Sequence, residues 1–251
     1  MLGLGTNIIK SGAGVKTIVT DSLVLKHNYA LSPVQPLSDG AASFDGTDDY
    51  ISVSDAASLS FGDASADSAF SISAWVFMKD ATSFMIMGKG VAGSDHEWLM
   101  YVTGADKIAL YTYDESASSY VGRTHNTALT TYENTWVHFA GTYDATEANS
   151  GFKIYLNGVQ VDDTDFGSGS YTATEAGSSN VHIGRYNANY ADGYICNAGI
   201  WDAVLSQPQI KSIMNKNYAG LTSSEKTDLV SWWNLSADAN DNHGSNNGTL
   251  S

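Results

Sequence analysis

Two apolar runs with a polar loop between them occupy Thr135–Val159 (TWVHFAGTYDATEANSGFKIYLNGV). The first run is Trp136–Tyr143 and the second is Phe152–Leu156. Apolar and polar residues alternate along the second run, which is the period-2 pattern of a strand with one buried face. Asn157-Gly158 follows at once, and this dipeptide tolerates the positive φ angles of a type I′ turn. The stretch therefore predicts two strands and a hairpin that returns at Val159.

Similar patterns along the chain predict further strands and few helices. Ser206-Gln207-Pro208-Gln209 has the form of a capping box, with Leu205 and Ile210 as a hydrophobic staple, and a second helical signal opens at Thr222. The predicted strands are Ala42–Val53 (two strands around an Asp-Gly turn), Phe70–Met78, Phe84–Gly88, Glu97–Thr103, Lys107–Tyr113, Asn180–Arg185, Tyr194–Trp201 and Leu229–Leu235. Loops are predicted at Gly88–Asp95 and Tyr186–Asp192, and a turn-rich tail follows at Ser236–Ser251.

Length, charge and cysteine content narrow the class of protein. A β-sandwich of 251 residues is commonly one domain. The formal net charge of -15, with only 12 scattered basic residues, excludes nucleic acid as a partner. Cys196 is the single cysteine, so no intrachain disulfide forms. No apolar stretch approaches a membrane span and the first residues lack the pattern of an export signal, so we expect synthesis in a host cytoplasm and no membrane partner.

Residues 1–40 differ from the remainder. This segment is Gly-rich at its start, carries short β-branched runs, and is broken by Pro33 and Pro36. It predicts an N-terminal arm for anchoring or oligomerisation, with the alternative of a loose tail plus a first strand. The domain proper is then predicted to span residues 41–251.

Five motifs in order resemble one family. They are FDGTDDYI (Phe44–Ile51), FSISAWV (Phe70–Val76), TWVHFAGTYD (Thr135–Asp144), KIYLNGV (Lys153–Val159) and WDAVLSQPQI (Trp201–Ile210). Together they resemble the laminin-G-like and pentraxin-like branch of the concanavalin A-like β-sandwiches. The resemblance implies an all-β antiparallel sandwich (a jelly roll), here with one or two short C-terminal helices and the extended arm. A segment like Leu229–Leu235 usually precedes FDG in this family, so we expect this C-terminal strand to complete the sheet.

Catalytic motifs are missing from the sequence. Glycosidases on this fold carry closely spaced carboxylates on one strand, whereas the Glu residues here are widely separated. His96, His125 and His182 have no partners at ligand spacing, and His138 in a central strand is expected to be a satisfied core histidine. The sequence therefore predicts a protein that is not an enzyme.

Calcium is the candidate cofactor, on the strength of the resemblance alone. Pentraxin-like domains bind calcium through an Asp before one strand, which Asp95 matches, and through an acidic group in a later loop. That later loop here reads Arg185-Tyr186-Asn187, so the site is expected to be weakened, with Asp192 as a partial replacement. The predicted metal ligands are thus Asp95 and Asp192. Asp45, Asp48 and Asp49 are interpreted first as turn formers, and the tail Asp238–Asn247 is a rival calcium location.

A glycan-binding site is predicted at the same loops. Aromatic rings on loops stack on sugar faces, although a sandwich core also needs aromatics, which is the interpretation for Trp75, Trp136, Trp201, Trp232 and Trp233. The predicted ligand-binding residues are Asp95, Trp98, Tyr186, Asn187 and Tyr190.

Two functions of different classes follow. The first is a non-catalytic structural protein of a virus particle, a head decoration or appendage on the virion surface, because the opening residues and Ser22–Gly40 resemble marine bacteriophage structural proteins. Its partners would be a capsid or other virion protein bound through the arm, further copies of itself in a homo-oligomer, and a cell-surface glycan. The alternative is a free bacterial carbohydrate-binding lectin module.

Overall fold

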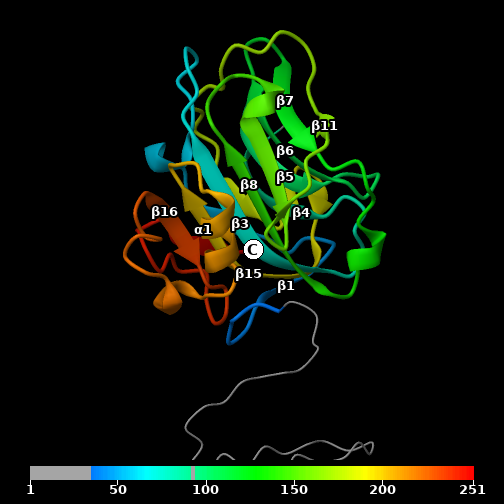
Figure 1. Ribbon diagram of the computed structural model, residues 1–251, viewed down its shortest axis with the longest axis vertical. Coiled ribbons are helices and arrows are strands. Elements are labelled where there is room, and N and C mark those ends of the chain that lie inside the picture. Colours follow the sequence, from blue (N-terminus) through cyan, green and yellow to red (C-terminus); the bar gives the residue numbers. More distant parts are fainter. Residues whose placement is uncertain (1–34, 92–93) are drawn as a thin grey trace, which may run out of the picture. The chain divides into compact units, whose positions relative to one another are not determined.

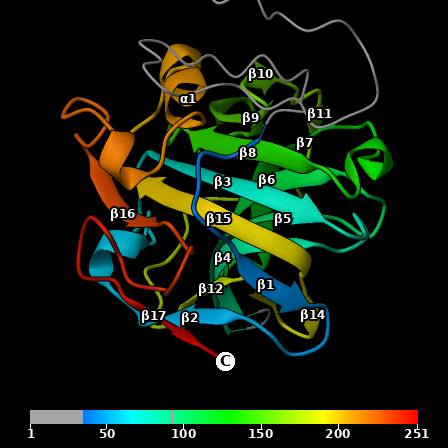
Figure 2. The same cartoon turned by 90° about the horizontal axis from the view of Figure 1, so that it is seen from below.

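Antiparallel strands in two stacked sheets form the framework of the computed structural model, which describes residues 35–91 and 94–251. Residues 33–251 form one unit by themselves. Figure 2 shows the seven-stranded sheet in front, with the eight-stranded sheet behind it. The predicted all-β sandwich is confirmed. The predicted arm, residues 1–40, falls almost entirely outside the described residues and stays a prediction.

The seven-stranded sheet has the order β1-β15-β3-β8-β9-β10, and β16 also pairs with β15. Every pairing in it is antiparallel. Its strands are β1 (Ala42–Asp45), β3 (Phe70–Met78), β8 (Trp136–Tyr143), β9 (Phe152–Leu156), β10 (Val159–Gln160), β15 (Asp192–Trp201) and β16 (Leu229–Trp233).

The eight-stranded sheet has the order β11-β7-β6-β5-β4-β12-β2-β17. Its strands are β2 (Ile51–Val53), β4 (Met85–Val91), β5 (Ser94–Val102), β6 (Ile108–Asp114), β7 (Ser119–Thr124), β11 (Thr164–Asp165), β12 (Val181–Ile183) and β17 (Gly248–Leu250). A separate two-stranded hairpin joins β13 (Arg185–Tyr186) to β14 (Asn189–Tyr190).

Helical structure is scarce among the described residues. The single α-helix is α1 (Gln207–Ile213), and the 3₁₀-helices are Ala57–Leu59, Thr130–Tyr132, Asn149–Gly151 and Tyr218–Gly220. None of these helices combines the length and the apolar character needed to cross a bilayer.

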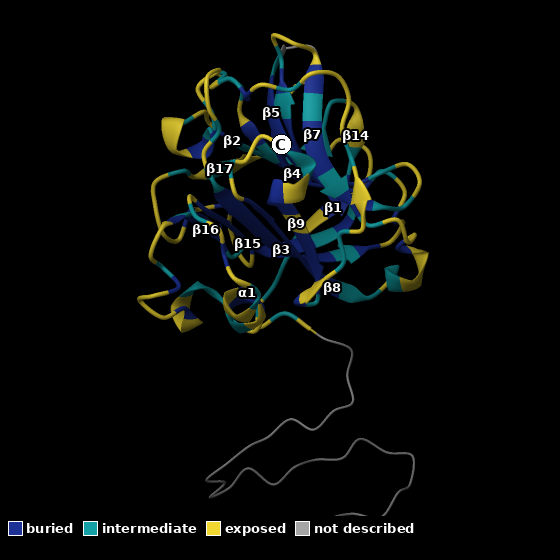
Figure 3. Ribbon diagram, turned by 45° about the horizontal axis from the view of Figure 1, so that its top comes forward, coloured by how far each residue is buried: buried dark blue, intermediate teal, exposed yellow. Residues whose placement is uncertain are grey.

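The core lies between the two sheets, where the strands are buried along most of their length (Figure 3). Alternate residues of facing strands fill it, including Ile154 and Phe139 from one sheet and Leu110 and Met100 from the other. Burial of such side chains supplies the main driving force for folding. Strand alternation therefore leaves a second, outward face on each sheet.

The hairpin predicted at Asn157-Gly158 is confirmed. Asn157 and Gly158 have φ angles of 50° and 74°, as a type I′ turn requires. Val159 pairs with Leu156 across the turn, so β10 continues the sheet directly from β9. Local signals were sufficient here because the turn and the alternation agree.

The predicted helix start is also confirmed, and α1 packs on the outward face of the seven-stranded sheet (Figure 1). The Gln209 Oε1 atom accepts the backbone N–H of Ser206 at 2.9 Å, which completes the capping box. Ile210 and Ile213 pack against Trp201 and Trp232. The second helical signal, at Thr222, was wrong: the chain forms only turns between Ser223 and Asp228, where the Glu225 carboxylate accepts the backbone N–H of Thr222.

Three predicted loops turn out to contain strands. The Gly88–Asp95 loop is wrong, because β4 continues to Val91 and β5 begins at Ser94. The Tyr186–Asp192 loop contains most of the β13–β14 hairpin. The turn-rich tail contains β17, which pairs with β2. The β17 strand pairs with a distant partner and the β13–β14 strands are very short, whereas the β4–β5 ends are rich in Gly, Ser and Asp, so none of these segments carries a clear periodic signal.

Candidate functional site

Tyrosines gather on the outward face of the eight-stranded sheet. On β6, Leu110 points into the core, so alternation directs Tyr111 and Tyr113 to the opposite face. Tyr111 pairs with Leu99 of β5 and Gly122 of β7, and these neighbours also lie outside the core cluster. A side chain at position 122 would meet the Tyr111 Cβ atom at 2.5 Å, so glycine there gives the ring its room.

These rings surround a pocket of about 260 Å³, which we call the tyrosine pocket. The Tyr111 ring centroid lies 5.4 Å from that of Tyr120 and 5.7 Å from that of Phe166. The tyrosine pocket is lined by Tyr101, Tyr111, Tyr113, Tyr120, Phe166, Tyr186 and His96. Except for Tyr111 and His96 these side chains are half-buried, so ring surface remains accessible.

His96 is the buried polar group of the tyrosine pocket. It is 3% exposed and stacks on Tyr113, with the ring centroids 4.7 Å apart. Its Nδ1 atom lies 2.9 Å from the Tyr186 hydroxyl, and its Nε2 atom has no hydrogen-bond partner among the described residues. A buried polar atom without a partner is costly, so it needs an explanation such as a bound ligand.

Burial keeps His96, Tyr101 and Tyr186 uncharged at neutral pH. Burial lowers the pKa of His96 to about 4, well below its ordinary value of 6.5. Burial likewise raises the pKa of Tyr101 and of Tyr186 to about 12. The pocket therefore offers ring faces and neutral hydrogen-bonding groups.

A second cavity, of about 290 Å³, shares His96 with the tyrosine pocket and is lined also by Asp95, Glu115, Ser116 and Glu175. We call it the acidic cavity. The Glu175 carboxylate accepts the backbone N–H groups of Glu115 (2.8 Å) and Ser116 (3.0 Å). Asp95 accepts the Ser178 hydroxyl at 2.9 Å. These bonds hold the carboxylates beside the ring cluster.

Two predicted ligand-binding residues, Asp95 and Tyr186, are brought together here. Asp95 lines the acidic cavity and Tyr186 the tyrosine pocket, and His96 lies between them. Asp95 lies in β5 with a φ angle of 53°, and not in a loop.

Trp98 was wrong as a sugar-stacking residue. It is 0% exposed, and its Nε1 atom donates to the Leu59 carbonyl oxygen at 3.0 Å. Its ring packs beside Phe61 and Phe70 in the core. The reason is register: Trp98 pairs with Thr112, which shares the core-facing parity of Leu110, so its indole points between the sheets.

Asn187 and Tyr190 lie in the β13–β14 hairpin and do not line the tyrosine pocket. Asn187 forms its turn with a φ angle of 54°, and its carbonyl oxygen accepts the Arg185 Nε–H at 3.0 Å. The Arg185 guanidinium lies 5.6 Å from the Tyr190 ring centroid and 4.5 Å from that of Tyr50. A cation of the protein itself thus occupies the neighbourhood of the Tyr190 ring.

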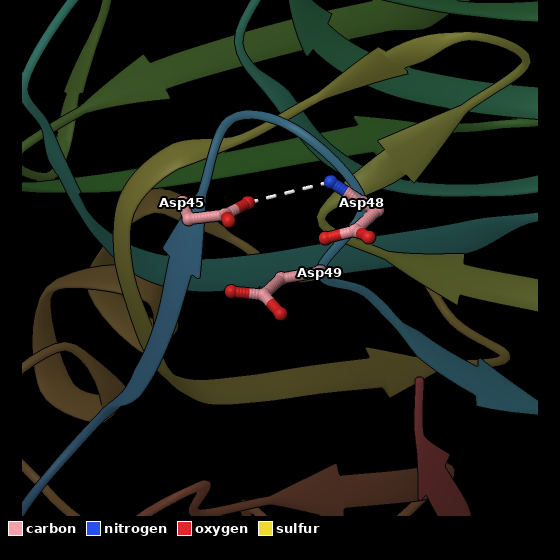
Figure 4. Close-up of side chains that lie close together, drawn as sticks. All are labelled: Asp45, Asp48 and Asp49. Atoms are coloured by element: carbon pink, nitrogen blue, oxygen red, sulfur yellow. Dashed lines mark hydrogen bonds between the residues drawn. The ribbon is translucent and has the colours of Figure 1, made fainter.

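The two predicted metal ligands are not brought together. Asp95 accepts a hydrogen bond from the Ser178 hydroxyl. Asp192 instead accepts one, at 2.8 Å, from the ammonium of Lys79, which directly follows β3. Among the described residues, the acidic group compact enough to hold an ion is Asp45, Asp48 and Asp49, whose oxygens lie within 4.8 Å of one another (Figure 4).

That group has a turn-forming role. The Asp45 Oδ1 atom accepts the backbone N–H of Thr47 at 2.8 Å and of Asp48 at 3.3 Å, and these bonds lower the pKa of Asp45. In the rival location, Asp241 accepts the backbone N–H groups of Trp232, His243 and Asn246. Calcium binding therefore stays a prediction, both at the Asp45 turn and in the Asp238–Asn247 tail.

Comparison with known proteins places the fold. A family model described as the concanavalin A-like lectin/glucanases superfamily matches residues 45–211. A structure from Bacteroides ovatus described as a carbohydrate-binding protein is similar, with a TM-score of 0.56 and 20% identity; the match covers 84% of this chain and 57% of that one.

Weaker likenesses extend to other sandwiches. Domains LG4-5 of the mouse laminin α1 chain match with a TM-score of 0.45 and 10% identity, over 64% of this chain and 40% of that one. Domain 4 of an extracellular arabinanase from Geobacillus stearothermophilus, solved with arabinotriose, matches with a TM-score of 0.43 and 18% identity, over 60% of this chain and 68% of that one. No curated protein matches the sequence.

Proposed function

Since the chain belongs to the concanavalin A-like lectin/glucanases superfamily, we propose that it is a non-catalytic glycan-binding module whose tyrosine pocket holds a sugar ring. The observation that carries this proposal is the cluster of six aromatic rings around one pocket on an outward sheet face. Aromatic side chains exposed together in this way mark a binding surface, because isolated apolar exposure needs no explanation but a contiguous patch does.

The chemistry of the pocket suits a sugar. The C–H faces of a pyranose ring pack against aromatic faces, while its hydroxyl groups need hydrogen-bond partners. Phenol groups supply such partners, and the Nε2 atom of His96 is buried beside them without a partner of its own. At about 260 Å³ the pocket lies just below the size of sites for drug-sized ligands, so it suits one sugar residue of a longer glycan.

A binding role is favoured over catalysis by what lines the pocket. Glycoside hydrolysis uses two carboxyl groups that flank the scissile bond. The residues that line the tyrosine pocket include no carboxylate, and in the adjoining acidic cavity Asp95 and Glu175 already accept hydrogen bonds from within the protein. The similar Bacteroides ovatus protein is described as carbohydrate-binding, and this chain spans 57% of that chain's length, so the likeness concerns the fold alone.

The setting we propose is a virus particle, with the module displayed on the virion surface as a head decoration or appendage. The support is the resemblance of the opening residues to phage structural proteins and the net charge of -15, which keeps crowded copies apart. Mass spectrometry of purified virions tests this setting. If the chain is missing from all particles, the free bacterial lectin becomes the better account.

Glycan binding is tested by calorimetric titration of the full chain with a panel of oligosaccharides. We expect wild type to bind at least one of them, and Tyr113→Ala to bind it about tenfold more weakly, which is the upper value of an aromatic contact. The matched control is Tyr194→Ala, a half-buried tyrosine on β15 that packs against Phe77. Binding by no glycan, or equal binding by wild type and Tyr113→Ala, would contradict the proposal.

A further inference from the structure

The charge around the candidate site has one sign. Asp95, Glu115 and Glu175 line the acidic cavity, which meets the tyrosine pocket at His96. Of the described residues, those that line the two cavities include no lysine or arginine. A ligand that spans both cavities therefore meets carboxylates and no compensating positive charge.

Cations next to residues of the two cavities are engaged within the protein. Arg123 pairs with Asp165, the residue before Phe166. The Lys89 ammonium, which bonds the Gly177 carbonyl oxygen close to Asp95, is fully buried and paired with Glu97 and Asp55. Arg185, the neighbour of Tyr186, lies over the Tyr50 and Tyr190 rings. The negative charge of the acidic cavity is thus left for a ligand.

The rings add to this preference. The face of an aromatic ring carries negative potential and attracts cations within about 6 Å. The Tyr113 and Tyr186 rings lie 4.7 Å and 4.9 Å from the His96 ring centroid, at the junction of the two cavities. A cation at this junction would be near the tyrosine rings and the carboxylates, whereas an anion would be repelled by the carboxylates.

His96 supplies an independent sign of a missing ligand. It is buried, it lines both cavities, and its Nε2 atom has no partner. We take the tautomer that carries its proton on Nδ1, in which Nδ1–H donates to the Tyr186 hydroxyl oxygen and Nε2 is a lone-pair acceptor. An ammonium N–H is the donor that such an acceptor and the neighbouring carboxylates share.

We propose that the ligand of this site is a glycan with free, protonated amino groups, such as a glucosamine oligomer, in preference to a neutral or an acidic glycan. This inference rests on the proposed function and specifies its sugar. The sugar ring occupies the tyrosine pocket, and its ammonium group points to His96 and the acidic cavity.

The test compares the binding of three oligosaccharides of equal length to the full chain at about pH 6. They are a glucosamine oligomer, its N-acetylated form, which lacks the charge, and a uronic acid oligomer. We expect the glucosamine oligomer to bind about tenfold more tightly than the N-acetylated form, and the uronic acid oligomer to bind most weakly. The preference should shrink as salt is raised, since salt screens exposed charges.

A triple variant, Asp95→Asn with Glu115→Gln and Glu175→Gln, removes the three charges with little change of shape. We expect the ratio of its affinity for the glucosamine oligomer to its affinity for the N-acetylated form to fall towards one. The matched control is Asp202→Asn with Asp228→Asn and Asp238→Asn, three exposed residues in the C-terminal part of the chain. It removes the same number of negative charges, so a ratio that falls to the same extent would mean general attraction to an acidic protein and would overturn the inference.

Two failures are distinguishable. If Tyr113→Ala weakens glycan binding but the glucosamine oligomer binds no more tightly than its N-acetylated form, this inference is wrong and the proposed function stands. If no glycan binds through Tyr113, both are wrong. Thermal unfolding of each variant shows whether lost binding reflects lost folding.

Discussion

The outward faces of the two sheets differ although the same alternation produces both. On the seven-stranded sheet, Trp201 and Trp232 are buried beneath α1 and the following turns. On the eight-stranded sheet, Tyr113 and Tyr120 remain half-exposed. We call these the covered face and the tyrosine face. The chain covers one apolar surface with its own C-terminal segment and leaves the other open, and we propose that a ligand binds there.

The largest expected difference concerns stability. Trp201→Ala empties a packed site and removes the bond from Nε1 to the Glu225 carbonyl oxygen, so it should cost about 3–5 kcal/mol. Tyr113→Ala on the tyrosine face should cost less than about 1 kcal/mol, since this side chain is only half-buried. Denaturant unfolding monitored by circular dichroism measures both. Equal costs would mean that the tyrosine face is packed like a core.

The second expected effect concerns the buried ion pairs of Lys89, which we expect to stabilise the fold. Its ammonium is 0% exposed and binds Glu97, Asp55, the Ser60 hydroxyl and the Gly177 carbonyl oxygen. Lys89→Met leaves Glu97 buried without its partner, so we expect a loss of about 3 kcal/mol in unfolding free energy.

The control for Lys89 is Lys79→Met, which breaks an exposed pair with Asp192. Exposed pairs contribute little, so its melting temperature should stay close to that of wild type. A similar fall in both variants would show that burial is not what makes the Lys89 pair important.

Acid should act on the tyrosine face through His96. Because burial lowers its pKa from 6.5 to about 4, the unfolded chain binds a proton in this range and the folded chain does not. Stability attributable to His96 should therefore fall as pH decreases from 6.5 to 4, by about 2–3 kcal/mol. His96→Gln lacks this dependence, and the pH profile of the difference between it and wild type measures the effect.

On the covered face, stability should depend on pH over a different range. Burial alone would raise the pKa of Glu225, but hydrogen bonds from Lys216, Ser212 and Thr222 outweigh it and lower the pKa to about 2. The stability it contributes is present above about pH 4.5 and is lost as pH falls to 2. The Glu225→Gln difference profile should thus be flat where that of His96→Gln is steep, and overlapping profiles would contradict the separation.

The smallest effect is expected at the Asp45 turn, which lies on neither face. Asp45→Ala removes the acceptor for two backbone N–H groups and should lower the melting temperature slightly, whereas Asp48→Ala should change it less. Added CaCl₂ should leave wild type unchanged if the turn only caps backbone groups. A rise in melting temperature that Asp45→Ala abolishes would show a bound ion.

Sequence reasoning succeeded where neighbouring residues determine the structure. The hairpin at Asn157-Gly158, the central strand Phe70–Met78 and the capping box at Ser206 all depend on short-range signals, and all are present. It failed at β17, because pairing with β2 is decided by residues far away in the sequence.

The candidate site was only partly predictable. Asp95 and Tyr186 were identified, but Tyr101, Tyr111, Tyr113, Tyr120, Phe166 and the role of His96 were missed. The alternation of Tyr111 and Tyr113 with Leu110 and Thr112 shows that the tyrosines share a face. Which face becomes the core depends on how the sheets stack, and that information is not local. Trp98 failed for the same reason.

The pairing of β2 with β17 has a consequence for how the chain acquires its structure. Ile51 lies opposite Leu250, almost the whole described chain away in sequence. Closing so large a loop costs conformational entropy before the contacts that stabilise it have formed. Topologies rich in distant pairings therefore fold slowly. During translation β2 is synthesised long before β17, so the backbone groups of β2 that pair with β17 stay unpaired until the end of the chain is made. We expect the β2 edge of the eight-stranded sheet to be the last part to mature and the part most exposed to mispairing on the way.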